Sequence, residues 1–223
     1  LSPSPGSSTP FPLGTTSDWT LNRSAAELRL PAGARVVRAE LVWGGSFGDR
    51  DENVSANIDD PVNFTLPDGS TSAITPDAST GHQDGGGSYS DGCFYVRTAD
   101  VTALVAAAGA GTYAVGHVPA TQGTGDDNNP VAGWTLAVLY EDSGQPIRNL
   151  TLFLGLEQSG GAAAEVTGFC TPPDGTVSGR LAVSAIEGDA KLTGDKLLFG
   201  PTSSLNDGNR LSNVRICGSR SYS

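Results

Sequence analysis

The sequence has 223 residues, with 30 Gly, 14 Pro and only 17% charged residues, which is typical of many short strands joined by tight turns. Acidic residues number 24 and basic residues 13, and the resulting net charge of −11 argues against binding to nucleic acid or to anionic membranes. Because no apolar run reaches the roughly 20 residues of a membrane span, membrane insertion is not expected either.

Residues 1–16 are rich in Pro, Ser and Thr and are predicted to be an extended arm or linker. Two interpretations are open: a disordered leader, or an arm whose Phe11 and Leu13 dock on a neighbouring subunit as an added strand. Residues 17–223 are predicted to form one domain. The sequence contains no Met, so a processed protein, a domain or a portion of a longer chain is expected.

The first half of this domain alternates between short apolar stretches and polar turns. The clearest strand covers residues 35–43, with Val37, Ala39, Leu41 and Trp43 on one face, and the Gly pair that follows should end it. Other strands are predicted within 19–30, at 54–58 and 62–66, and at 71–74 after a hairpin turn at Asp68–Gly69, followed by a long exposed loop over 77–92.

The second half contains one helix and the longest apolar run. Asp100 is a good N-cap for a helix over 101–108, which Gly109 or Gly111 should end. Residues 132–140 predict a central strand that forms a hairpin with a second strand at 149–156. Further strands are predicted at 93–96, 112–118, 176–186 and 211–216. The fold class is therefore all-β: a two-sheet β-sandwich, jelly-roll or Ig-like, with one short helix near 100–108.

The chain contains three cysteines, Cys93, Cys170 and Cys217, without the close spacing of a metal site. One disulfide with one remaining thiol is expected in an oxidising compartment, and three pairings are possible. Three buried thiols are the alternative.

Several stretches in a fixed order resemble a family of uncharacterised bacterial extracellular domains. They are residues 38–45 (RAELVWGG), 99–105 (ADVTALV), 111–115 (GTYAV), 132–142 (AGWTLAVLYED) and 146–153 (PIRNLTLF), with a weaker similarity at 188–199. The family occurs in large secreted or cell-wall-associated proteins and is broadly adhesin-like. The resemblance implies a bacterial extracellular or cell-surface location, and it supplies no catalytic residues.

One stretch matches the motif of a serine nucleophile. Gly44–Gly48 is a literal G-x-S-x-G after a strand, which in a hydrolase must turn directly into a helix and present Ser46 to a histidine. Here the acidic residues 49–53 follow, and only His82 and His117 could act as bases. A glycine-rich exit from the strand is therefore favoured over an active site, and the chain is not expected to be an enzyme.

Two clusters of oxygen side chains could bind calcium. Asp49, Asp51 and Asn53 alternate so that their oxygens could converge on one cation, and Asp126, Asp127 and Asn128 form a second oxygen-rich turn. Hard oxygen ligands favour Ca²⁺ over Zn²⁺. Solvated acidic turns without a metal are the alternative.

Together these features predict a non-catalytic extracellular structural protein, an adhesin module or a subunit of a surface fibre. Its partner would be a second copy or another surface protein, joined by β-strand addition and stabilised by calcium. The alternative is a secreted glycan-binding module that uses the 77–92 loop with exposed aromatic residues such as Trp19. A serine or glycoside hydrolase is the third interpretation.

Overall fold

The structure is a computed structural model of the whole chain, and it describes residues 18–49, 52–84, 93–122, 131–156, 174, 182–184, 186, 198 and 216–217. The elements in chain order are η1 (Trp19–Leu21), β1 (Arg23–Leu28), β2 (Arg35–Asp49), β3 (Glu52–Asn53), η2 (Ser55–Asn57), β4 (Val62–Thr65), β5 (Thr71–Ile74), β6 (His82–Asp84), β7 (Cys93–Asp100), α1 (Thr102–Ala108), β8 (Gly111–Gly116), β9 (Ala132–Glu141), β10 (Val183–Ser184) and β11 (Ile216–Cys217).

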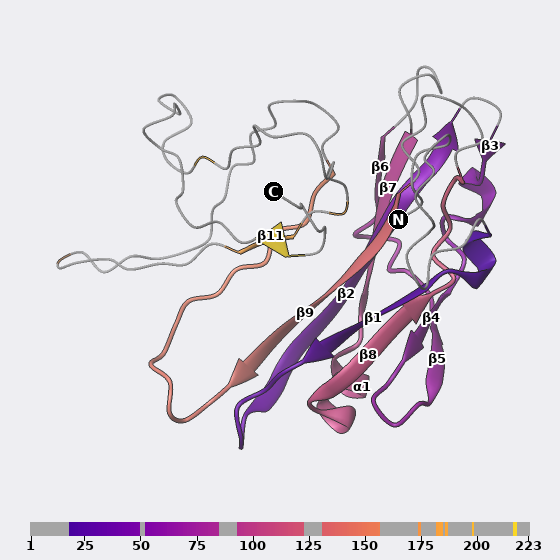
Figure 1. Cartoon of the computed structure of the whole chain (residues 1–223). Coiled ribbons are helices and arrows are strands. Elements are labelled where there is room, and N and C mark those ends of the chain that lie inside the picture. Colours follow the sequence, from indigo (N-terminus) through magenta and orange to yellow (C-terminus); the bar gives the residue numbers. More distant parts are fainter. Residues whose placement is uncertain are drawn as a thin grey trace, which may run out of the picture.

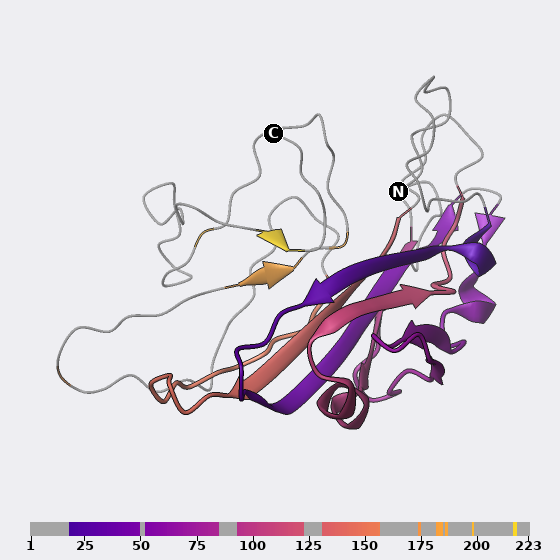
Figure 2. The same cartoon turned by 60° about the horizontal axis from the view of Figure 1, so that its bottom comes forward.

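Two antiparallel sheets face each other, which confirms the predicted all-β sandwich (Figure 1). One sheet has the order β1-β8-β4-β5, and the other has β2 at its centre, with β7 and then β6 on one side and both β9 and β3 pairing with β2. Figure 2 shows β1 and β8 crossing in front of β2 and β9. The short β10 and β11 form a separate parallel pair.

The core lies between the inner faces of the two sheets. Leu41 and Trp43 of β2 and Tyr95 of β7 are fully buried from one side, and Phe64 of β4 and Tyr113 of β8 are fully buried from the other. The last two rings stack with centroids 5.5 Å apart. Along β4 and β8 these large side chains alternate with polar or small ones, as in a half-buried strand. In β2 and β7 the intervening Val42 and Val96 are buried as well, so both faces of these strands are covered there.

Strand β2 is longer than predicted, and part of the predicted inner face is wrong. The pairing of β2 with β9 shifts between Val36 and Arg38, and this bulge turns Val37 outward, so that 45% of Val37 is exposed while Val36 is buried. The Gly44–Gly45 pair does not end the strand. A Cβ at Gly44 would lie 2.2 Å from the carbonyl oxygen of Tyr95, so glycine here allows the close approach of β7.

The hairpin of β4 and β5 is confirmed, with Gly69 at φ +87° in its turn. The helix α1 is also confirmed, but its predicted N-cap is wrong: the N-cap is Val101, one residue later, because the helix begins at Thr102. The Asp100 carboxylate still accepts a hydrogen bond from the Thr102 N–H at 2.9 Å. The strand predicted at 54–58 is wrong, because the 3-10 turn η2 occupies its centre.

Strand β9 is confirmed over its whole predicted range and extends one residue further, to Glu141, but its predicted hairpin with 149–156 is wrong. It pairs with β2 and with no other described strand, so it is an edge strand as far as the described residues go, although its Thr135 hydroxyl forms a hydrogen bond with the Ser184 hydroxyl of β10. Residues 149–156 have no regular secondary structure. In Figure 1 this segment runs back past β9 without joining the sheet.

No helix among the described residues is both long enough and apolar enough to cross a membrane.

Candidate functional site

Among the described strands, the two sheets end on the same side of the sandwich. There β1 forms the edge of one sheet and β9 the edge of the other, as far as the described strands go. The two edges touch where the indole N–H of Trp134 donates to the Ser24 hydroxyl at 2.7 Å. Because Trp134 also packs against the core, this contact anchors the start of β9 to β1.

Beyond that contact the edges part and leave a groove of about 200 Å³. It is lined by Ala26–Leu28 of β1, Tyr113 of β8 and Trp134–Leu136 of β9. Ala26 is opposite Tyr113 in the sheet and so belongs to the inner face, yet Ala26 is exposed. An exposed residue on the inner face means that the sandwich is not covered at this point.

The inner face of β9 is apolar along its whole length. Trp134, Leu136 and Val138 alternate along the strand and pack against the core, although each is only partly buried. Residues 132–140 contain no charge and no proline. Edge strands of soluble proteins normally carry charges, prolines or bulges that block further pairing, and this part of β9 has neither a charge nor a proline.

Exposed apolar side chains concentrate immediately after this edge. Of the seven large hydrophobic residues exposed in the described structure, five lie within 140–153: Tyr140, Ile147, Leu150, Leu152 and Phe153. Ile147 is 103% exposed and Leu150 is 59% exposed. Exposed apolar side chains that gather in one segment are more typical of an interaction site than of ordinary surface.

A tight turn separates β9 from this apolar segment. The Gln145 N–H donates to the Asp142 carbonyl at 3.0 Å, and the Gly144 N–H donates to the Asp142 carboxylate at 2.9 Å. Arg35 and Glu141 form an exposed ion pair at 2.6 Å where β9 ends. Charge therefore lies at the end of β9, while the length of its edge remains neutral.

Ser46, the serine of the G-x-S-x-G stretch, is buried inside β2 and hydrogen-bonded to its neighbours. It is 1% exposed, and its hydroxyl pairs with the Thr121 hydroxyl at 2.6 Å and accepts from the Val131 N–H at 3.1 Å. Neither predicted base contacts it: His117 packs edge-on against Trp19, and His82 lies on the exposed β6. Ser46 lies within a strand and not in the strand-to-helix elbow in which this motif presents a nucleophile.

The predicted calcium ligands lie mostly outside the described residues. Asp51 and the Asp126, Asp127 and Asn128 turn fall there, as does the side chain of Asp49. The Asn53 side chain accepts a hydrogen bond from the Ser55 N–H at 2.8 Å. No group of three or more His, Cys, Asp or Glu side chains that could hold a metal occurs among the residues that the structure describes.

The predicted arm residues Phe11 and Leu13 also lie outside the described residues. Cys93 is buried in β7, Cys170 is not described, and only the backbone of Cys217 is, so the disulfide pairing stays a prediction.

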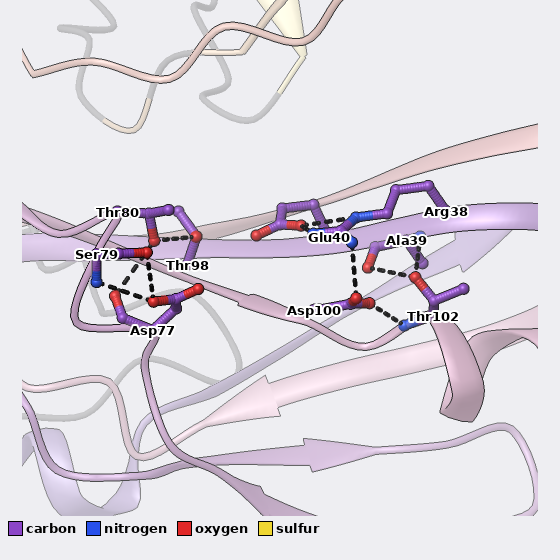
Figure 3. A network of polar contacts seen from close by, with 9 residues as sticks. All are labelled: Arg38, Ala39, Glu40, Asp77, Ser79, Thr80, Thr98, Asp100 and Thr102. Atoms are coloured by element: carbon purple, nitrogen blue, oxygen red, sulfur yellow. Dashed lines mark hydrogen bonds and ion pairs between the residues drawn. The ribbon is translucent and has the colours of Figure 1, made fainter.

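A network of polar side chains covers part of the outer face of the β2–β7 sheet (Figure 3). Arg38 donates to the largely buried Glu40 at 2.8 Å and to Asp100 at 2.7 Å. Asp77 accepts from Ser79, and the pKa of Asp77 lies below its usual value because the Ser79 N–H and hydroxyl donate to it.

The pKa of Asp100 is also lowered, chiefly by hydrogen bonding from Thr102 and less by the charge of Arg38. Lowered pKa values keep these two carboxylates ionised at neutral pH. A general acid requires a raised pKa, so the network of Figure 3 is suited to fastening β2 to the start of α1 rather than to donating protons.

No protein-family profile, curated protein or solved structure matches this chain in sequence or fold comparisons.

The alternating pattern of residues 149–156 predicts a strand, but the sequence does not show which edge that strand would join. Residues 149–156 alternate as a strand should, and they were assigned to a hairpin with β9, whereas the structure leaves both stretches without that pairing. The exposed inner face at Ala26 could not be found from the sequence, because it depends on which strands become neighbours.

Proposed function

We propose that this chain is a non-catalytic structural module of the bacterial cell surface that assembles by β-strand addition at the open side formed by β1 and β9. The observation that carries the proposal is the neutral edge of β9, which pairs with no described strand other than β2 and precedes a segment with exposed apolar side chains. The described β10 contacts β9 only through side chains, where the Thr135 and Ser184 hydroxyls form a hydrogen bond. An unprotected edge is a template for pairing with another chain.

The surface chemistry supports an extracellular setting. The chain has a net charge of −11 and contains only two lysines, Lys191 and Lys196. The resemblance to adhesin-like domains, which rests on the ordered stretches between residues 38 and 153, suggests the same location. A module of this kind would act as an adhesin domain or a fibre subunit, with a second copy or another surface protein as its partner.

Calcium binding by Asp49, Asp51 and Asn53, or by the Asp126–Asn128 turn, remains part of the proposal. Calcium would fix loops near the sheet ends, because oxygen ligands from separate turns are joined through one cation.

Sedimentation velocity of the full chain over a wide concentration range tests the proposal. We expect assemblies larger than one chain whose fraction rises with concentration, because strand addition is a bimolecular association. A single chain at every concentration would contradict it. The same measurement after deletion of residues 1–16 tests the arm: an unchanged assembly removes Phe11 and Leu13 from the mechanism.

A further inference from the structure

The exposed segment after β9 has the pattern of a strand that lacks a sheet. In residues 149–156 (NLTLFLGL) every second position is Leu: Leu150, Leu152, Leu154 and Leu156. In an extended chain these four side chains lie on one face, because successive residues point to opposite sides. A strand with one entirely apolar face is suited to covering the core of a sandwich.

On the side of the sandwich between β1 and β9, apolar residues of the inner faces remain partly exposed. Along β9, Trp134, Leu136 and Val138 face the core and remain partly exposed. Across the groove, Ala26 is exposed on the inner face of β1. A strand added to the edge of β9 with a leucine face turned inward would cover both surfaces and would pair with the backbone on the side of β9 away from β2.

The segment does not cover this site within its own chain. The turn at Asp142–Gln145 reverses the chain, but residues 149–156 pair with no strand, and Leu150, Leu152 and Phe153 are 45–59% exposed. Pro146 favours an extended Gln145 and thus directs the chain out of the turn. Within the described residues, each chain therefore presents one strand-like segment and one sheet edge that have no strand partner on that side.

We propose that residues 149–156 are the strand that is added, and that a second copy of the chain supplies it to the β1–β9 groove. The exchange is reciprocal: two copies related by a two-fold axis fill both grooves with both donor strands, which closes the assembly as a dimer. This inference rests on the proposed function and names its donor, in place of Phe11 and Leu13 of the arm.

Two pairs of variants of the full chain separate donor from acceptor. Ala26→Arg places a long charged side chain in the groove, and its control Ala25→Arg places the same side chain on the neighbouring exposed residue of β1, which does not line the groove. Leu152→Asp puts a charge on the leucine face of the donor, and its control Thr151→Asp puts it on the opposite face. All four positions are exposed or lie in coil in the single chain, so each monomer should keep its fold.

Light scattering after size-exclusion chromatography gives the mass of each sample. We expect wild type and both controls to form dimers, and Ala26→Arg and Leu152→Asp each to weaken the dimer by about 100-fold, because a charge in an apolar interface is costly. A mixture of Ala26→Arg, which keeps its donor, with Leu152→Asp, which keeps its acceptor, should form a mixed dimer. Urea unfolding of each variant verifies that the monomer fold is intact.

Other outcomes overturn the inference in distinguishable ways. If assembly survives both substitutions but is lost on deletion of residues 1–16, the arm is the donor: our assignment fails and assembly by strand addition stands. If the wild-type chain is monomeric at every concentration, the proposed function fails with it. If the two variants are both monomeric and their mixture stays monomeric, reciprocal exchange is wrong.

Discussion

Replacing Ser46 by Ala tests whether the G-x-S-x-G stretch is structural. The substitution removes a hydroxyl that accepts from the Val131 N–H at 3.1 Å and pairs with the Thr121 hydroxyl at 2.6 Å. All three residues are at most 4% exposed, so water cannot easily replace the lost partner. Losing two neutral hydrogen bonds and leaving a buried N–H unsatisfied costs about 2–3 kcal/mol of unfolding free energy.

Equilibrium unfolding in urea measures this cost. With a slope of about 2 kcal/mol per molar urea, the midpoint should fall by about 1 M. Ser143→Ala is the matched control, because Ser143 is exposed in the turn after β9 and its loss should change stability by less than about 0.5 kcal/mol. A Ser46→Ala midpoint equal to that of the control would refute the structural role of the hydroxyl.

Three further predictions follow from the same structure. Gly44→Ala should destabilise the fold by about 3 kcal/mol in urea unfolding, because the added Cβ would lie 2.2 Å from the Tyr95 carbonyl oxygen. The control Gly155→Ala should have little effect, because Gly155 has open space around it. Equal urea midpoints for the two variants would contradict this prediction. The lowered pKa of Asp100 contributes stability that is present above the unfolded pKa of about 4 and is lost as the pH falls through the folded pKa. The difference in unfolding free energy between wild type and Asp100→Asn should therefore shrink below about pH 4. A difference that stays constant from pH 7 to about pH 3 would refute this prediction. If calcium joins the Asp-rich turns, a chelator should lower the thermal midpoint and added Ca²⁺ should restore it, and an unchanged midpoint would exclude a stabilising site.

Features set by local chemistry were predictable from the sequence. The β4–β5 hairpin follows from an Asp–Gly turn between alternating residues, and the helix α1 follows from its apolar positions and from Gly109 after them, although it begins one residue later than the Asp100 N-cap predicts. Strand β9 was found by its uninterrupted aromatic and branched residues.

Features that depend on neighbours were not predictable. Val37 points outward because of a bulge that exists only in the pairing of β2 with β9. Strand β9 was assigned to the centre because both of its faces are apolar, yet that pattern does not specify how many strands lie beside it. Residues 149–156 have the local propensity of a strand, but a strand forms only where an edge receives it.

For the candidate sites too, the sequence shows which residues are present but not which neighbours surround them in the fold. The residues around Ser46 match the sequence motif of a serine nucleophile. The burial of Ser46 and its hydrogen bonds to Thr121 and Val131 are visible only in the fold. The groove beside Ala26 has no sequence signature, because it arises where the edges of two sheets diverge.

Amide hydrogen exchange of the full chain at increasing concentration tests the central claim most directly. Exchange reports whether the backbone groups of β9 and of residues 149–156 are paired. We predict that both segments become protected together as the concentration rises, since strand addition from a second copy pairs them at the same time. Protection that is the same at every concentration, whether absent or already complete in the single chain, would contradict the account.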